Sequence, residues 1–287
     1  MTAQLLDGTA FLEAAKDELR ARVKLLADRG ITPGLGTILI GDDPNSASYV
    51  GHKHADSADI GIVSHHVGLP ASATQGDVLA AIEAFNRDPS VDAFIVQLPL
   101  PAHVDEETAL RTVDPKKDAD GLHPFNLGRL MIGVPGPRPC TPLGIQALLV
   151  HYGVAIESRR VVVVGRGLTI GRPLAALLSL KEPNANATVT QCHTGTRDLA
   201  EHTREADILI AAAGRAGIIT PDMVKPGAAV VSGGITWEGK RLVPDVTEEC
   251  AEVAAWITPR LGGVGPTTRA MLLRNTLDAA ERAAEAG

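Results

Sequence analysis

Apolar residues in the first third of the chain recur with a helix-like period that alternates with short strand-like runs. Residues 8 to 30 place apolar side chains every three or four positions and stop at Gly30, a residue that favours helix C-termini. The remaining predictions for this region are strands at 34 to 41, 61 to 69 and 91 to 101, and helices at 46 to 59 and 77 to 88. Strands that alternate with helices predict parallel βαβ units and an α/β fold.

The same alternation resumes after residue 140 and continues to about residue 235. The pattern predicts a helix, an apolar strand at 159 to 164, two further helix and strand pairs, and a last strand. This order is typical of a Rossmann-like dinucleotide-binding domain with a parallel sheet. Residues 113 to 142 are rich in Pro, Gly and charge and show no clear period, so we expect them to link two domains.

Length, charge and cysteine content narrow the possible classes of function. A chain of 287 residues is long enough for two domains. Lys and Arg number 27 against 34 Asp and Glu, a net charge of -7 without a basic block, so neither a nucleic acid nor an anionic membrane is expected as a partner. The apolar runs are strand-sized and the N-terminal segment carries acids, which favours a cytoplasmic protein. Cys140, Cys192 and Cys250 lack CxxC spacing, which favours neither a disulfide framework nor a thiolate metal site.

A glycine-rich turn follows the apolar strand and precedes an apolar helix. In this context Gly165 would allow the tight turn, Gly167 the close approach of a pyrophosphate, and Gly171 the packing of the helix. The spacing is one residue longer than the commonest form. We interpret the segment as a cofactor site, with an ordinary glycine-rich turn as the alternative.

The next predicted strand indicates which cofactor is bound. NAD-specific sites usually carry an acidic residue at its end, whereas residues 192 to 197 contain none. Thr194 and Arg197, together with Arg166 in the turn, could instead contact a 2'-phosphate by charge-assisted hydrogen bonds. NADP is therefore favoured over NAD. The alternative is that these arginines are solvated surface charges.

Candidate catalytic residues lie in the first domain. Tyr49 and Lys53 are four residues apart on a predicted helix, so they project from one face. Gln97 stands at the end of a predicted parallel strand, where ligands bind in such folds, and Asp120 lies in the linker sequence DADG. An incidental Tyr and Lys pair and a turn aspartate are the alternatives.

These residues occur within longer strings that resemble one family, the bifunctional methylenetetrahydrofolate dehydrogenase/cyclohydrolases. The strings that carry the resemblance are GDDPNSASYVGHK, VQLPLP, PKKDADGLHPFNLGRL, PCTPLG, VVVVGRGLTIGRP, ATVTQCHT and GGVGPTT. The resemblance covers nearly the whole chain. It implies oxidation of 5,10-methylenetetrahydrofolate with NADP, and then hydrolysis of the methenyl product to 10-formyltetrahydrofolate, in one-carbon metabolism and without a metal.

The resemblance also implies site residues. Lys53 would be the general acid/base of the hydrolytic step, oriented by Tyr49 and tuned by Gln97, and Asp120 would bind the pterin ring. Further substrate contacts are implied for Leu98, Gly263 and Pro266. The residues implied to bind the cofactor are Gly165, Arg166, Gly167, Ile170, Gly171, Thr194, Arg197 and Ile235.

By the same resemblance we expect a first domain of residues 1 to 120, completed by a C-terminal helix at 265 to 287, and an NADP domain at 140 to 264. The folate cleft is expected between them, and the protein is expected to be a homodimer. Three residues depart from the family pattern. Gly167 replaces a common serine, Ser232 a common aspartate, and Leu261 a common proline, which bears on cofactor affinity and on the folate loop.

Two other classes share parts of this pattern. A short-chain dehydrogenase also uses a Tyr and Lys pair four residues apart, but its pair follows the glycine turn, whereas Tyr49 precedes Gly165. A non-catalytic nucleotide-binding protein on the same scaffold would be expected to lack Lys53 or Asp120, and both are present. An enzyme is therefore favoured.

Overall fold

The computed structural model describes residues 3–238 and 241–286 and divides into two compact units, each with its own parallel sheet. The three-stranded unit consists of residues 14–129, 136–140 and 269–287, and the six-stranded unit of 1–13, 130–135 and 141–268. A mixed α/β fold of two parts was expected, and this expectation is confirmed.

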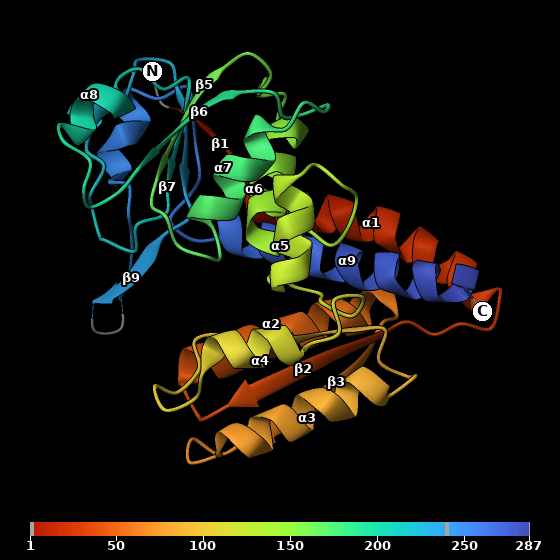
Figure 1. Ribbon diagram of the computed structural model, residues 1–287. Helices are drawn as coiled ribbons and strands as arrows, with labels where there is room; N and C mark the ends of the chain where they lie inside the picture. Colours follow the sequence, from red (N-terminus) through yellow and green to blue (C-terminus); the bar gives the residue numbers. More distant parts are fainter. Residues whose placement is uncertain (1–2, 239–240, 287) are drawn as a thin grey trace. The chain divides into compact units, whose positions relative to one another are not determined.

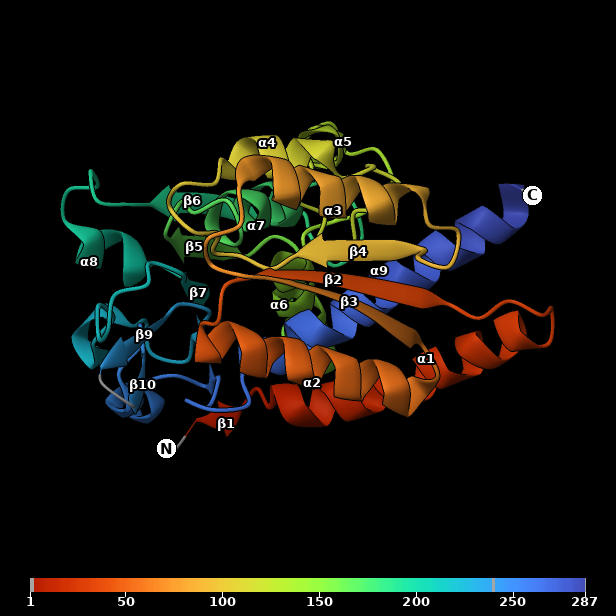
Figure 2. The same cartoon turned by 90° about the horizontal axis from the view of Figure 1, so that it is seen from below.

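The sheet of the three-stranded unit has the order β3-β2-β4, with all pairs parallel. Its strands are β2 (Gly34–Ile40), β3 (Val63–Leu69) and β4 (Ala93–Val96), and its helices include α2 (Pro44–Ile60), α3 (Gln75–Arg87) and α4 (Glu106–Thr112). Figure 2 shows α2 and α3 on opposite sides of this sheet. Ile38 and Ile40 of β2 form a core with Ile82 and Phe85 of α3, so the strands are fixed between two helical layers.

Local capping sets both ends of α2, the helix that carries Tyr49 and Lys53. The Asp43 carboxylate accepts a hydrogen bond from the Ser46 amide at 2.8 Å, which satisfies one of the free N–H groups of the first turn. Gly61 ends the helix in the left-handed conformation with φ 89°, which a residue without a Cβ adopts without strain.

Helices α1 (Gly8–Ala27), α5 (Pro124–Met131) and α9 (Val264–Ala286) each have residues in both units. Within the three-stranded unit, Arg22 of α1 pairs with Asp278 and Glu281 of α9. The buried Asp56 of α2 pairs with Lys16 at 2.7 Å and with Arg269 at 2.5 Å. Two cations on one buried carboxylate compensate the cost of removing it from water.

The sheet of the six-stranded unit has the order β1-β11-β8-β7-β5-β6 and is parallel throughout. Its strands are β1 (Gln4–Leu5), β5 (Arg160–Val164), β6 (Thr188–Cys192), β7 (Ile208–Ala211), β8 (Ala229–Ser232) and β11 (Trp256–Ile257). Its helices include α6 (Cys140–His151), α7 (Gly171–Ser179) and α8 (Leu199–Thr203). Figure 1 shows α6 and α7 on one side of the sheet and α8 on the other. Because both faces are covered, the central strands are continuous apolar runs.

Three details differ from the sequence-based expectations. Strand β1, before the first predicted helix, was not predicted, and it pairs with β11 in the six-stranded unit. The expected linker contains helix α5 and buries Ala119, so it is an ordered part of the fold. An antiparallel hairpin of β9 (Ile235–Glu238) and β10 (Arg241–Pro244) follows β8 and was not predicted.

Among residues 3–238 and 241–286, no helix combines the length and the apolar character that a membrane span requires.

Candidate functional site

Lys53 contacts both Tyr49 and Gln97 in the three-stranded unit. Lys53 and Tyr49 lie one turn apart on α2, with the Lys53 Nζ atom 4.6 Å from the centre of the Tyr49 ring. Gln97 directly follows β4, and its Oε1 atom accepts a hydrogen bond of 3.0 Å from Lys53 Nζ. The Gln97 amide nitrogen donates to the carbonyl of Leu98 at 2.7 Å, which orients the amide oxygen toward the lysine.

Burial determines the electrostatics of Lys53, whose relative exposure is 4%. Burial lowers the pKa of this amine, because removing the ammonium from water disfavours the charged form. The negative charge of Asp120 acts in the opposite direction. A lysine with a lowered pKa can hold or release a proton near neutral pH, which an exposed lysine does not do.

The loop that carries Asp120 is held from two sides. The buried Asp118 carboxylate accepts hydrogen bonds from the amides of Gly121, Leu122 and His123. Asn275 on α9 donates to the carbonyl oxygens of Ala119 and Arg138, at 2.8 and 3.0 Å. These contacts fix the backbone on both sides of Asp120.

Sequence reasoning did not single out Asp118 or Asn275. Asp118 stands in the same DADG string as Asp120, and nothing local distinguishes the two carboxylates. Asn275 was detectable as a polar residue between the apolar positions Leu273 and Leu277 of the last helix. Its partner Ala119 is 156 residues away in the chain, so the pairing itself could not be predicted.

The glycine turn of the six-stranded unit connects β5 to α7, as the sequence predicts. Gly165 has φ 133°, and a Cβ there would lie 2.1 Å from the carbonyl oxygen of Ala212. A Cβ on Gly171 would lie 2.4 Å from the carbonyl oxygen of Gly165. Both positions therefore exclude any side chain, because the backbone of the turn packs against itself and against the segment after β7.

Gly167 differs from these two glycines, because apart from its two chain neighbours no residue has an atom within 4 Å of the position of a Cβ there. The N-cap residue of α7, Ile170, makes no side-chain hydrogen bond to the first turn of the helix. Amide groups at such a helix start can face an anion, and the helix dipole favours negative charge there. The open space and the uncapped helix end fit a bound pyrophosphate.

The remaining residues predicted to bind the cofactor lie at the same edge of the sheet. Thr194 and Arg197 follow β6 and are exposed, as is Arg166 in the turn after the neighbouring strand β5. Ile235 begins the hairpin after β8 and is 50% exposed, which is unusual for an isoleucine. The carboxyl ends of parallel strands are where such sheets bind dinucleotides.

The predicted substrate residues come from both units. Gly263, directly before α9, and Pro266, in its first turn, are buried within the six-stranded unit. The other predicted substrate residues belong to the three-stranded unit: Tyr49, Lys53, Gln97, Leu98 and Asp120.

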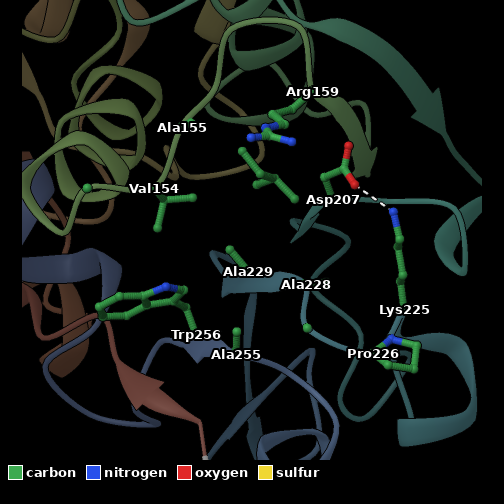
Figure 3. A pocket seen from close by; sticks show the side chains of 13 residues that line it. Val154, Ala155, Arg159, Asp207, Lys225, Pro226, Ala228, Ala229, Ala255 and Trp256 are labelled. Carbon is green, nitrogen blue, oxygen red and sulfur yellow. Dashed lines mark hydrogen bonds and ion pairs between the residues drawn. The ribbon is translucent and has the colours of Figure 1, made fainter.

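A cavity of about 450 Å³ lies at the opposite edge of the six-stranded sheet, where its strands begin. Figure 3 shows Trp256 and Val154 on one side, and Asp207 paired with Lys225 at 2.6 Å on the other. No residue predicted to bind substrate or cofactor lines it. The cavity is therefore separate from the edge that carries the glycine turn.

Two domains of one enzyme family match this chain in sequence. Residues 6–120 match the catalytic domain of tetrahydrofolate dehydrogenase/cyclohydrolase, and residues 139–284 match the NAD(P)-binding domain of the same enzymes. The Bifunctional protein FolD of Syntrophotalea carbinolica is 59% identical over 288 aligned positions, which cover 100% of this chain and 99% of the relative.

Solved structures match as well. The FolD dehydrogenase/cyclohydrolase from Campylobacter jejuni is 42% identical with a TM-score of 0.93, and the match covers 98% of this chain and 99% of that one. The Trypanosoma brucei FolD enzyme, solved with NADP and an inhibitor, is 40% identical with a TM-score of 0.93 and 99% coverage of both chains.

Proposed function

The chain belongs to the tetrahydrofolate dehydrogenase/cyclohydrolase family, and from this membership we propose how its residues divide the work of two reactions. The protein is a bifunctional, NADP-dependent enzyme. It oxidises 5,10-methylenetetrahydrofolate to the 5,10-methenyl form and hydrolyses that form to 10-formyltetrahydrofolate. NADP, when bound, accepts the hydride released in the first reaction.

Lys53 manages protons in the hydrolytic step. Water attacks the cationic methenyl carbon and loses one proton, which gives a carbinolamine. When the bond from this carbon to the leaving ring nitrogen breaks, the hydroxyl loses its proton to become the formyl oxygen and the nitrogen gains one, so one proton is released overall. A neutral amine can accept the first proton and its ammonium form can return one, and burial favours the neutral form of Lys53. The single observation that carries this role is the hydrogen bond from the buried Lys53 amine to Gln97.

The neighbours of Lys53 orient its amine and hold the folate. The Gln97 amide oxygen directs the amine, and the Tyr49 ring beside it supplies a flat surface for the folate. Asp120 accepts hydrogen bonds from the amino and ring N–H groups of the pterin, a task that suits a carboxylate. Leu98, Gly263 and Pro266 are further folate contacts in this proposal.

The glycine turn and the α7 N-terminus bind the pyrophosphate of NADP through Gly165, Gly167, Ile170 and Gly171. Arg166, Thr194 and Arg197 contact the 2'-phosphate, because they provide exposed donors at adjacent strand ends where an NAD site would carry an acid. Ile235 lies against the nicotinamide ribose, a role that accounts for its exposure.

The proposal extends to assembly and location. We expect a homodimer, and equilibrium sedimentation that shows only monomer at micromolar concentration would contradict this. We also expect the protein in the cytoplasm. All three cysteines are free and buried, which suits a reducing compartment.

Replacement of Lys53 by methionine tests the division of roles. Lys53→Met keeps the apolar stem and removes the amine, so cyclohydrolase turnover should fall by at least about 10², the contribution typical of a general acid/base. NADP affinity should not change, because the proposed cofactor residues belong to the other unit. Any loss of dehydrogenase activity in Lys53→Met should reflect only the contribution of the amine to the positioning of the folate.

Lys24→Met is the matched control, since Lys24 is an exposed lysine of α1 in the same unit, and it should keep both activities. The assignment fails if folded Lys53→Met protein hydrolyses methenyltetrahydrofolate within a few-fold of the parent rate.

A further inference from the structure

The loop after β7 is organised around one carboxylate that no sequence motif indicated. Asp245 follows β10, and its relative exposure is 0%. Its carboxylate accepts hydrogen bonds from three successive backbone amides, those of Ala213 and Gly214 at 2.6 and 3.0 Å and that of Arg215 at 2.8 Å. Three successive N–H groups that converge on one point form an anion-binding concavity, and this chain fills it with its own aspartate.

The same carboxylate fixes the segment before Ile235. A Cβ on Gly234 would lie 2.0 Å from an Asp245 carboxylate oxygen, so the carboxylate occupies the space next to this glycine. The Asp245 amide donates to the carbonyl of Gly234 at 3.2 Å. These contacts of Asp245 with Gly234 therefore fix the backbone directly before Ile235, the exposed residue that begins the hairpin.

The organised loop also touches the glycine turn. The carbonyl oxygen of Ala212 is the atom that a Cβ on Gly165 would strike, and the Ala212 amide donates to Val164 at the end of β5. Asp245 thus links three segments at one edge of the sheet: the glycine turn, the loop after β7, and the start of the hairpin. All three come from the unit proposed to bind NADP.

From these contacts we propose that Asp245 is a positioning residue for the hydride-transfer step. It holds the loop after β7 and the segment before Ile235 in the arrangement that receives the nicotinamide half of the cofactor. The proposal rests on the proposed function, because it assigns this edge of the sheet to NADP. Asp245 acts through the backbone and does not itself contact substrate or cofactor in the proposal.

The test compares the two activities in Asp245→Asn. An amide in place of the carboxylate keeps the shape but points an N–H donor at a loop amide, so the loop shifts. A displacement of about 1 Å can cost about 10² in rate, and we expect a loss of this order in dehydrogenase kcat/KM for NADP. Cyclohydrolase activity, measured from methenyltetrahydrofolate, should stay near the parent value because Lys53 and Asp120 belong to the other unit.

Asp207→Asn is the matched control. Asp207 is also an aspartate that accepts a backbone hydrogen bond, from the Arg160 amide at 2.9 Å, but it stands at the opposite edge of the same sheet. Loss of its pair with Lys225 should affect stability and leave the KM for NADP unchanged. A purely structural role of Asp245 would make the two variants behave alike.

Gly234→Ala is a second variant, which displaces the carboxylate without removing it, and it decides the question if Asp245→Asn does not fold. The same selective loss of dehydrogenase activity is expected. Equal losses of both activities, or an unchanged dehydrogenase in either folded variant, would overturn the proposal. Assays of the parent protein come first, so absence of either parent activity would count against the proposed function instead.

Discussion

The proton transfer proposed for Lys53 depends on the burial of its amine, which costs free energy because the amine loses its hydration. A buried amine surrounded by α2 and the end of β4 loses its hydration, and one amide oxygen replaces only part of it. Burial therefore lowers the pKa of Lys53 in the folded state, whereas in the unfolded chain the amine has its ordinary pKa of about 10.5. The same property that suits the residue to proton transfer should destabilise the fold.

This cost predicts how stability changes with pH. Between the lowered pKa and the ordinary one, the unfolded state binds more protons at this site, so the free energy of unfolding should rise with pH there. Each tenfold change in the proton affinity of the amine corresponds to about 1.4 kcal/mol. Urea unfolding of the parent and of Lys53→Met from pH 7 to pH 10 should show the parent gaining stability relative to the variant. A difference in the free energy of unfolding that stays constant across that range would contradict a lowered pKa. For Lys24→Met, the difference from the parent should not change with pH.

Individual elements differ in how well they can be predicted from the sequence. The turn between β5 and α7 was predictable because its glycines, its strand and its helix are adjacent in the chain. The spacing of Tyr49 and Lys53 on α2 was predictable for the same reason. Strand β1 and the pairing of Asn275 with the Asp120 loop were not, because each depends on partners far away in the sequence. Asp245 belongs to this second class, since the three amides that it binds lie 30 to 32 residues earlier.

The glycine turn gives a prediction that separates folding from binding. Gly165→Ala should lower stability by about 1–3 kcal/mol and weaken NADP binding, because φ is positive and Ala212 blocks the new methyl group. Gly167→Ser should leave stability unchanged, because the protein leaves that space open. Its hydroxyl can contact a phosphate, so NADP affinity should rise by up to about tenfold. Urea unfolding and NADP titration check both variants, and equal stability losses would show that Gly167 is packed in the same way as Gly165.

The contact of α9 with the Asp120 loop gives a second prediction for an element. Asn275→Ala removes the side-chain amide that donates to the carbonyl oxygens of Ala119 and Arg138, which should cost about 1–3 kcal/mol of stability. Cyclohydrolase activity should fall as well, because Asp120 loses part of its support. Arg274→Ala, an exposed position on the same helix, should change stability by less than about 0.5 kcal/mol. If denaturant unfolding gives similar values for the two variants, Asn275 does not hold the loop.

In the proposed function, the two kinds of chemistry belong to two different units. The lysine proposed to transfer protons belongs to the three-stranded unit and the glycine turn to the six-stranded unit, each with a separate sheet. The two reactions can therefore be damaged separately, which the Lys53 and Asp245 variants exploit. The net charge of -7 does not oppose an anionic cofactor locally, because Arg166 and Arg197 stand at the edge where it is proposed to bind.

One absorbance measurement tests the central claim, that this single chain carries out both reactions and prefers NADP. The purified protein is mixed with 5,10-methylenetetrahydrofolate and either NADP or NAD, and the formation of reduced nicotinamide and of the methenyl product is followed with time. We predict reduction with NADP at a far higher kcat/KM than with NAD, and enzyme-dependent decay of the methenyl signal as 10-formyltetrahydrofolate forms. Comparable efficiency with NAD, or a methenyl product that decays only at its spontaneous rate, would contradict the account.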